Sequence, residues 1–154
     1  MTNKKENGTI VNRKARARYQ VLEELEVELV LEGAEVKSLR LGRGGISEAF
    51  VRISEGEAWV HNMVVPAYQG GHEDYDPSKT RKLLLHRREL LRLSKRMEGK
   101  NLALVPLKLY FKHNRAKLLI GLAWGVKEYE RRDELKKKDL HRELRRQFKE
   151  AQIK

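Results

Sequence analysis

The 154-residue sequence has no cysteine, only three prolines, few aromatic residues and no long apolar run. Without cysteine the chain can form neither a disulfide framework nor a thiolate metal site, which fits a reducing compartment. No stretch of about 18 apolar residues is present to span a bilayer, and the polar residues 1–7 do not resemble a secretory signal. We therefore expect a cytoplasmic protein with one domain plus tails, because this length supports one sizeable core but not two.

What the chain has in excess is positive charge, which is concentrated at its ends. The formal net charge is +12, and residues 1–18 hold six Lys and Arg against one acid, while residues 125–154 hold eleven against seven. A near-neutral body with basic ends is typical of a protein that binds a polyanion, because each neutralised phosphate releases counterions. A basic membrane-surface helix would carry similar charge, but neither end has a wide apolar face to bury in lipid.

Both basic ends are predicted to lie outside a barrel domain formed by residues 19–124. Residues 1–18 are expected to be a mobile arm that either settles on RNA or only solubilises the chain, since residues 12–18 are too polar to bury. The tail, residues 125–154, has an apolar stripe of Leu140, Leu144 and Phe148 that is too narrow to support a helix by itself. We expect this tail to become helical only when bound.

Alternating apolar and polar residues predict the strands of the barrel domain. The predicted strands are residues 19–31, with an irregularity near Glu23 and Glu24, then 46–53, 57–65, 102–112 and 115–124, with tight turns at 54–56 and 113–114 and with Phe50, Trp59 and Met63 in the core. The strands do not alternate with helices in a βαβ rhythm, which argues against a parallel sheet. We therefore predict an antiparallel barrel of OB type, a mainly β fold that often binds nucleic acid.

Two helices are predicted to accompany the strands. After Gly33, helical spacing brings Val36, Leu39 and Leu41 to one side while Glu35, Lys37 and Arg40 face elsewhere, so we expect a short helix that plugs one end of the barrel. The second helix is predicted over residues 81–97. Its inward residues would be Leu83, Leu84, Leu90, Leu91, Leu93 and Met97, and its outward cations Arg81, Lys82, Arg87, Arg88, Arg92, Lys95 and Arg96.

Three other kinds of site are alternatives to RNA binding for this sequence: a phosphate loop, a metal site and a hydrolytic site. The glycine-rich residues 41–45 lack the Gly-Lys-Ser/Thr ending and the strand-to-helix order of a phosphate loop, which excludes that motif. His72, Asp74 and Asp76 could form a hard-cation or hydrolytic site, but three loop residues without a second ligand group rarely do so. A hydrolase using Glu35 with His72 or Asp76 would need residues from separate elements to converge. We expect no metal, no cofactor and no catalysis.

Two motifs, in this order, are more specific than composition. Glu35-Val36-Lys37-Ser38-Leu39-Arg40 is followed by Asp76-Pro77-Ser78-Lys79-Thr80-Arg81-Lys82-Leu83-Leu84-Leu85. Both closely resemble the SsrA-binding protein family (small protein B), and the resemblance runs from about Asn12 to about Asp139. It implies an OB-type barrel that binds transfer-messenger RNA without catalysis and helps to rescue stalled bacterial ribosomes. It also implies that Asp76 and Pro77 form a turn that begins the second helix.

The same resemblance implies where the partners bind. The protein would stand where the missing anticodon arm of that RNA would be, holding its tRNA-like domain, while the tail enters the decoding region and message channel of the small ribosomal subunit. RNA contacts are expected at Asn12, Glu26, Lys37, Arg40, Leu84 and the pair Arg81 and Lys82, to which the basic arm adds Arg13, Lys14 and Arg16. Ribosome contacts are expected at Gly125, Lys127, Tyr129, Glu130, Arg131 and Arg132.

The sequence departs from the family pattern at four positions. Glu28 replaces a usual glycine, Trp124 and Val126 stand where cations are usual, and Glu130 lengthens an aspartate. The decoding-site contacts are therefore less well supported than the barrel contacts. A monomer is expected when the protein is free. The alternative function is a general structured-RNA-binding or ribosome-associated OB-fold protein, which would share the charge and the barrel.

Overall fold

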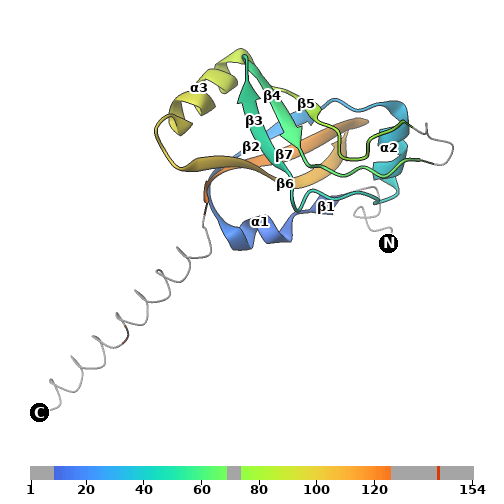
Figure 1. Ribbon diagram of the computed structural model, residues 1–154, viewed down its shortest axis with the longest axis horizontal. Coiled ribbons are helices and arrows are strands. Elements are labelled where there is room, and N and C mark those ends of the chain that lie inside the picture. The colour runs from blue at the N-terminus through green and yellow to red at the C-terminus, as the bar shows by residue number, and fades with distance from the viewer. Residues whose placement is uncertain (1–8, 69–73, 126–141, 143–154) are drawn as a thin grey trace, which may run out of the picture.

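The computed structural model describes residues 9–68, 74–125 and 142, and within them one antiparallel sheet closes into a ring (Figure 1). The strand order is β1-β6-β3-β4-β5-β2-β7, and β7 also pairs with β6 to close the ring. The strands are β1 (Ile10–Val11), β2 (Tyr19–Leu29), β3 (Phe50–Ser54), β4 (Glu57–His61), β5 (Arg81–Leu84), β6 (Leu102–Lys112) and β7 (Arg115–Gly125), and the helices are α1 (Arg13–Arg18), α2 (Gly33–Arg40) and α3 (Arg87–Met97). The predicted mainly β fold with an OB-type barrel is confirmed.

The long strands form as their alternation predicts. β2 pairs with β7 from Tyr19 to Glu28, and its register shifts between Val21 and Glu23, next to the predicted irregularity. β6 and β7 form a hairpin whose two turn residues, His113 (φ 53°) and Asn114 (φ 62°), both have the positive φ of a two-residue hairpin turn. This turn sets which β6 side chains lie beside which β7 side chains on the outer surface.

The hairpin of β3 and β4 is also present, but both strands are shorter than predicted. β4 stops at His61, because Asn62 has a φ of 60° and turns the chain out of extended geometry. Met63 is fully buried, as expected, whereas Phe50 and Trp59 are only partly buried. Phe50 instead stacks on the His61 ring, with 5.1 Å between the ring centroids.

The predicted helix over residues 81–97 begins later, at Arg87. Residues 81–84 form strand β5, which pairs with β4 on one side and β2 on the other and is needed to close the ring. Strand alternation puts Arg81 and Leu83 inside and leaves Leu84 46% exposed, so the prediction that Leu84 points inward is wrong. Asp76 does not cap a helix either, since its Oδ1 accepts the Ser78 amide in a turn at 2.9 Å.

The prediction of a mobile arm is wrong for residues 10–18, which form β1 and α1. Asn12 is 2% exposed, and its side chain caps α1 by accepting the Ala15 amide at 3.1 Å. The same side chain donates to the carbonyls of Ile46 at 3.0 Å and Pro106 at 2.8 Å, which ties α1 to the barrel. Ala15 packs with Val105, Leu107 and Ala123 in a second, smaller apolar cluster.

Helices α2 and α3 lie at opposite ends of the barrel (Figure 1). Leu39 of α2 and Leu93 of α3 are fully buried in the main core, so both helices contribute to one apolar cluster. The predicted plug helix is therefore present over Gly33–Arg40. Leu41, which was predicted to point inward, follows the end of the helix and is 58% exposed.

Gly44 allows the chain after α2 to pass close to the core. Its φ is +126°, and an added Cβ would lie 2.8 Å from Leu39 Cδ2 and 2.9 Å from the Val64 carbonyl oxygen. Gly44→Ala should therefore lower the free energy of unfolding by about 1–3 kcal/mol. Gly42→Ala is the matched control, since its φ is +76° but nothing lies within 4 Å of the added Cβ. Equal urea midpoints for the two variants would contradict the close-approach argument.

Candidate nucleic-acid interface

The outer face of β2 carries a row of carboxylates, each of which contacts a polar or cationic side chain from another element. Alternation along the strand turns Glu24, Glu26 and Glu28 to the same side. Glu24 contacts Arg16 of α1 at 2.9 Å. Glu26 contacts Tyr110 and Lys112 of β6. Glu28 contacts Arg115 and Lys117 of β7, at 3.0 Å and 3.9 Å. These contacts bring residues from α1, β2, β6 and β7 onto one surface, which we call the β2 face.

The sheet register extends this surface across four strands. Leu84 of β5 lies beside Glu28, Glu28 beside Lys117, and Lys117 beside Tyr110 of β6. A shallow hollow of about 400 Å³ opens here. It is lined by Glu26, Val27, Glu28, Leu84, Leu85, His86, Glu89, Arg115 and Lys117. The β2 face therefore combines carboxylate acceptors, cations and one exposed leucine.

Tyr110 is held as a hydrogen-bond donor on this face. Burial raises the pKa of Tyr110, and its hydrogen bond to Glu26 and the charge of that carboxylate raise it further. The phenol therefore stays protonated and donates to Glu26. A carboxylate has about four acceptor positions, so Glu26 keeps positions to accept from an amino or hydroxyl group of a ligand.

The α2 end of the barrel presents two cations on aromatic rings. Lys37 Nζ lies 5.6 Å from the centroid of Tyr68, and Arg40 Cζ lies 4.5 Å from the centroid of Phe111. Phe111 follows Tyr110 on β6, but strand alternation turns the two side chains to opposite faces of the sheet, and Phe111 packs against the core. Arg40 is therefore held at the α2 end of the barrel rather than on the β2 face. Both cations are exposed, and their heads remain available to a phosphate.

The exposed cations of α1 include the predicted contacts Arg13 and Lys14, and also Arg18, which was not predicted. Lys14 and Arg18 lie 3.5 Å and 3.7 Å from the carboxylate of Glu48, and Arg13 is also exposed. Such exposed pairs contribute little to stability and can exchange for a phosphate.

At the other end of the barrel, Glu23 of β2 forms ion pairs with Arg92 and Arg96 of α3. The hydrogen bond from Arg92 is the main reason that the pKa of Glu23 is lowered.

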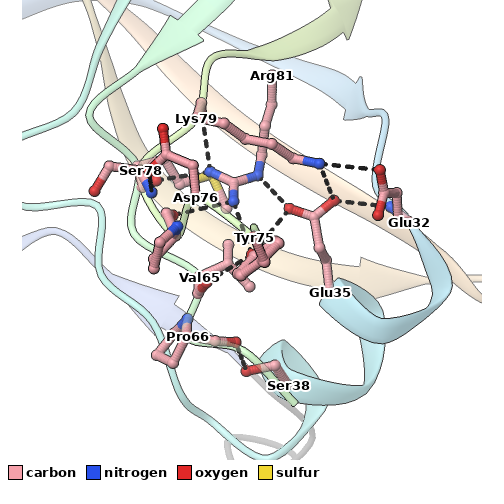
Figure 2. Close-up of polar contacts among 12 residues, drawn as sticks. Glu32, Glu35, Ser38, Val65, Pro66, Tyr75, Asp76, Ser78, Lys79 and Arg81 are labelled. Atoms are coloured by element: carbon pink, nitrogen blue, oxygen red, sulfur yellow. Dashed lines mark hydrogen bonds and ion pairs between the residues drawn. The ribbon is translucent and has the colours of Figure 1, made fainter. Parts of the chain in front are cut away.

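Arg81 is at the centre of a buried polar cluster under α2 (Figure 2). Its five N–H groups are all used, because Nε donates to Glu35 at 2.6 Å and the two Nη atoms donate to Tyr75 and to three carbonyls. Those carbonyls belong to Met63 at 2.7 Å, Lys79 at 3.0 Å and Pro77 at 3.1 Å. Its side chain is 1% exposed.

Glu35 completes this cluster, although it was predicted to face away from the core. Its side chain is 2% exposed, and it accepts the Glu32 amide at 2.9 Å and the Tyr75 hydroxyl at 3.3 Å. Burial by itself would raise the pKa of Glu35, but the Glu32 amide, Arg81 and the charge of Lys79 together hold it below its ordinary value. The Glu35–Arg81 pair thus joins α2 to β5 and to residues 75–79 (Figure 2).

Two of the predicted RNA contacts need correction. The side chains of Arg81 and Asn12 are buried and fully engaged inside the protein, so neither can reach an RNA phosphate. Glu26, Lys37, Arg40, Lys82, Leu84, Arg13, Lys14 and Arg16 lie at the surface and stay predictions. Of the predicted ribosome contacts, Gly125 is the last residue of β7, and Lys127, Tyr129, Glu130, Arg131 and Arg132 lie outside the described residues.

Sequence reasoning missed Tyr110, Lys112, Arg115 and Lys117, which contact the carboxylates of the β2 face. A signal for them was present in the two-residue turn at His113 and Asn114. That turn sets the register, placing Lys112 beside Arg115 and Tyr110 beside Lys117. Outward residues next to a turn can therefore be paired from sequence, but the strand across which they act cannot.

The other candidate sites gain no support from the described part of the chain. No group of three or more His, Cys, Asp or Glu residues that could hold a metal ion is found there, and His72 lies outside it. Glu35, the acid of the hydrolase alternative, is engaged by Arg81. Among the described residues, no helix is long and apolar enough to cross a membrane.

Comparison with known proteins gives one consistent result. The family model described as SmpB protein matches residues 9–150. The SsrA-binding protein of Aquifex aeolicus is 49% identical over 140 residues, which cover 90% of this chain and 89% of that protein. The SsrA-binding protein of Bacillus subtilis is 45% identical over 142 residues, covering 92% and 91%.

A solved structure agrees with these sequence matches. A chain of the structure described as "tmRNA-SmpB: a journey to the center of the bacterial ribosome" is 45% identical, with a TM-score of 0.66 over 80% of this chain and 87% of that chain. The barrel, the plug helix and both sequence motifs occur in the order that the resemblance implied. The chain belongs to the SmpB protein family.

Proposed function

We propose that this protein binds transfer-messenger RNA through the β2 face and the exposed cations of α2. The observation that carries this proposal is the row of Leu84, Glu28, Lys117 and Tyr110 across four strands, with Glu26 in contact with Tyr110. The name SsrA-binding protein, shared by relatives that match about nine-tenths of the chain, supports this partner.

The chemistry of the β2 face suits a folded RNA. Cations on β6, β7 and α2 can neutralise phosphates, which supplies most of the affinity. Glu26 can accept a hydrogen bond from a base amino group or a 2′-hydroxyl, and Leu84 can contact an unstacked base. The tRNA-like domain of the RNA would be held largely by shape, since A-form RNA hides base edges in its deep major groove. This function requires no catalysis and no cofactor.

The proposal extends to the ribosome. The protein would replace the anticodon arm that transfer-messenger RNA lacks, and residues beyond Gly125 would reach the decoding region and message channel of a stalled ribosome. The structural relative described with the bacterial ribosome supports this partner. We place the protein in the cytoplasm, where it joins trans-translation.

Arg40→Ala tests the binding surface. Its loss from the Phe111 ring should lower the free energy of unfolding by no more than about 1 kcal/mol, because exposed cation–π contacts are weak. Affinity for the tRNA-like domain should fall, and the slope of log affinity against log salt should decrease by about one. The measurements are a urea melt and a salt series of binding curves on the same preparation.

Arg52→Ala is the matched control, since its guanidinium also lies over a phenylalanine, Phe50, at 5.1 Å, but on β3. Equal loss of RNA affinity in both variants would contradict the assigned surface.

Competition by bulk tRNA should fail to displace the tRNA-like domain. Displacement would favour a general structured-RNA-binding protein instead.

A further inference from the structure

A second groove lies between α3, the tip of the β3–β4 hairpin and β5. Apart from Lys82, Leu84 and Leu85, the residues that line it have no role in the RNA contacts described so far. Its volume is about 670 Å³, within the range of roughly 300–1,000 Å³ for small-molecule sites. Gly56, Ala58 and Ser94 line it and leave it open because none has a large side chain. Leu90 and Leu91 come from α3, and Leu84 comes from β5.

The groove is lined by apolar leucine side chains and by two cationic side chains. Leu84 is 46% exposed, and Leu91 is 62% exposed although it was predicted to point inward, so two leucine side chains contact solvent at this site. Lys82 and Arg87 also line it. Lys82 contacts Glu57 at 2.9 Å, an exposed pair that an incoming phosphate can replace, and in the described part of the chain Arg87 forms no ion pair.

Charge decides which occupant fits this groove. The tail of this chain, residues 125–154, is basic, and a second copy carries the same net charge of +12, so Lys82 and Arg87 would repel both. A free phosphate has no apolar surface to pack against the leucines. A nucleotide offers an apolar base face together with a phosphate, which matches both parts of the groove.

The groove is also continuous with the β2 face. Leu84 and the following Leu85 line both the groove and the hollow beside Glu26 and Glu28. An RNA strand on the β2 face therefore passes the mouth of the groove at Leu84. The β2 face and the groove together form one continuous surface, which runs from β2 across β5 to α3.

We propose that this groove receives one unstacked nucleotide of the bound RNA, with its base between the leucines of α3 and β5 and its phosphate at Lys82 and Arg87. The inference rests on the proposed function, because the RNA on the β2 face supplies the nucleotide. It adds a site for the base of one unpaired nucleotide to a surface where cations contact phosphates and where Glu26 and Leu84 can contact base groups. The chemical class of the ligand is a single-stranded nucleotide within a folded RNA.

The first test fills the groove from α3. Ser94→Phe places a ring in the groove, and Ser94→Ala is its matched control. The probe is the tRNA-like domain of transfer-messenger RNA with 2-aminopurine placed in turn at each unpaired loop position. We expect Ser94→Phe to lower affinity about tenfold, because the ring fills the space that the base would occupy. It should also abolish the rise in fluorescence that unstacking causes, whereas Ser94→Ala should change neither.

Two further variants make the test independent of how the phenylalanine packs. Leu91→Asp puts a negative charge at an exposed position in the groove and should weaken binding without changing the melting temperature. Val64→Asp, at a valine that is 40% exposed, follows β4 and lines neither the groove nor the hollow, is the control. Arg87→Ala should reduce the salt slope by about one.

The outcomes separate the two proposals. If the wild-type chain does not bind the probe, the proposed function fails. If it binds and Ser94→Phe and Leu91→Asp match their controls in affinity and fluorescence, the nucleotide site is overturned and the function stands. Loss of ribosome association by these variants with RNA binding intact would assign the groove to a ribosomal protein and would also overturn the inference.

Discussion

Arg81→Ala should destabilise the protein by about 3–5 kcal/mol, the usual cost of removing one partner from a buried ion pair. Glu35, 2% exposed, would lose its guanidinium partner and keep only Lys79 at 3.6 Å, and the Met63, Pro77 and Lys79 carbonyls would lose their donor. This loss is a large fraction of the 5–15 kcal/mol typical of a folded domain. Urea unfolding at pH 7 measures it directly.

The loss should depend on pH in a defined direction. The pKa of Glu35 is lowered in the folded protein, so its contribution to stability is complete above the ordinary value of 4.5 and is lost as the pH falls through the lower folded value. In Arg81→Ala, loss of the guanidinium should raise the pKa of Glu35 relative to its wild-type value, while the Glu32 amide and Lys79 still act to lower it. The difference in unfolding free energy between wild type and variant should therefore shrink as the pH falls from the pKa of Glu35 in the variant to its lower pKa in the wild type.

Other variants separate charge from hydrogen bonding at this pair. Arg81→Lys keeps a cation but has three donors in place of five, so we expect an intermediate loss. The double variant Glu35→Leu with Arg81→Met should lose less than the sum of the single changes, because it leaves no unpaired buried charge. Lys82→Ala, at the exposed neighbour of Arg81, is the surface control. A loss in Arg81→Ala no larger than this control would contradict the role given to the buried pair.

Ending the chain at Lys127 should abolish peptide tagging on stalled ribosomes while leaving RNA binding nearly intact. β7 ends at Gly125, so the truncated chain keeps every strand of the ring and the whole β2 face. The removed residues include Arg131 and Arg132, which the proposed function assigns to the decoding region. The measurements are RNA affinity, ribosome association and tagging on matched preparations.

Charge reversal makes the same test without shortening the chain. Arg131→Glu with Arg132→Glu should reproduce much of the tagging defect, because reversed charges repel ribosomal RNA phosphates. Arg145→Glu with Arg146→Glu is the matched control, an adjacent arginine pair later in the tail, from which we expect a smaller loss. Normal tagging by the truncated chain would reject this division of labour, and lost RNA binding would assign the tail to the first interface as well.

Sequence reasoning succeeded where the pattern was long and local. β2, β6 and β7 each have eleven residues, which is enough for alternation to be unmistakable, and the turn at His113 and Asn114 needs no partner to be recognised. The plug helix was recovered for the same reason, as Leu39 faces the core. The family resemblance then indicated the fold from two short motifs.

Prediction failed where a short segment takes its structure from distant partners. β5 has only four residues, and its three consecutive leucines, 83–85, fit a helix as well as a strand. Pairing with β4 and β2 decides the outcome, and with it the burial of Arg81. The partner of that residue, Glu35, is 46 positions away, so no local pattern could show that two charges of the motifs neutralise each other inside the protein.

The ring of strands also determines when this protein can fold as it is made. β2 is completed early, but Tyr19 at its start lies beside Gly125 at the end of β7, so one edge of β2 has no partner until nearly the whole barrel has been synthesised. Pairing between such distant segments makes folding slow, and the open edge exposes the unfinished chain to aggregation. A ribosome that stops within β6 or β7 would therefore hold a nascent chain that cannot close.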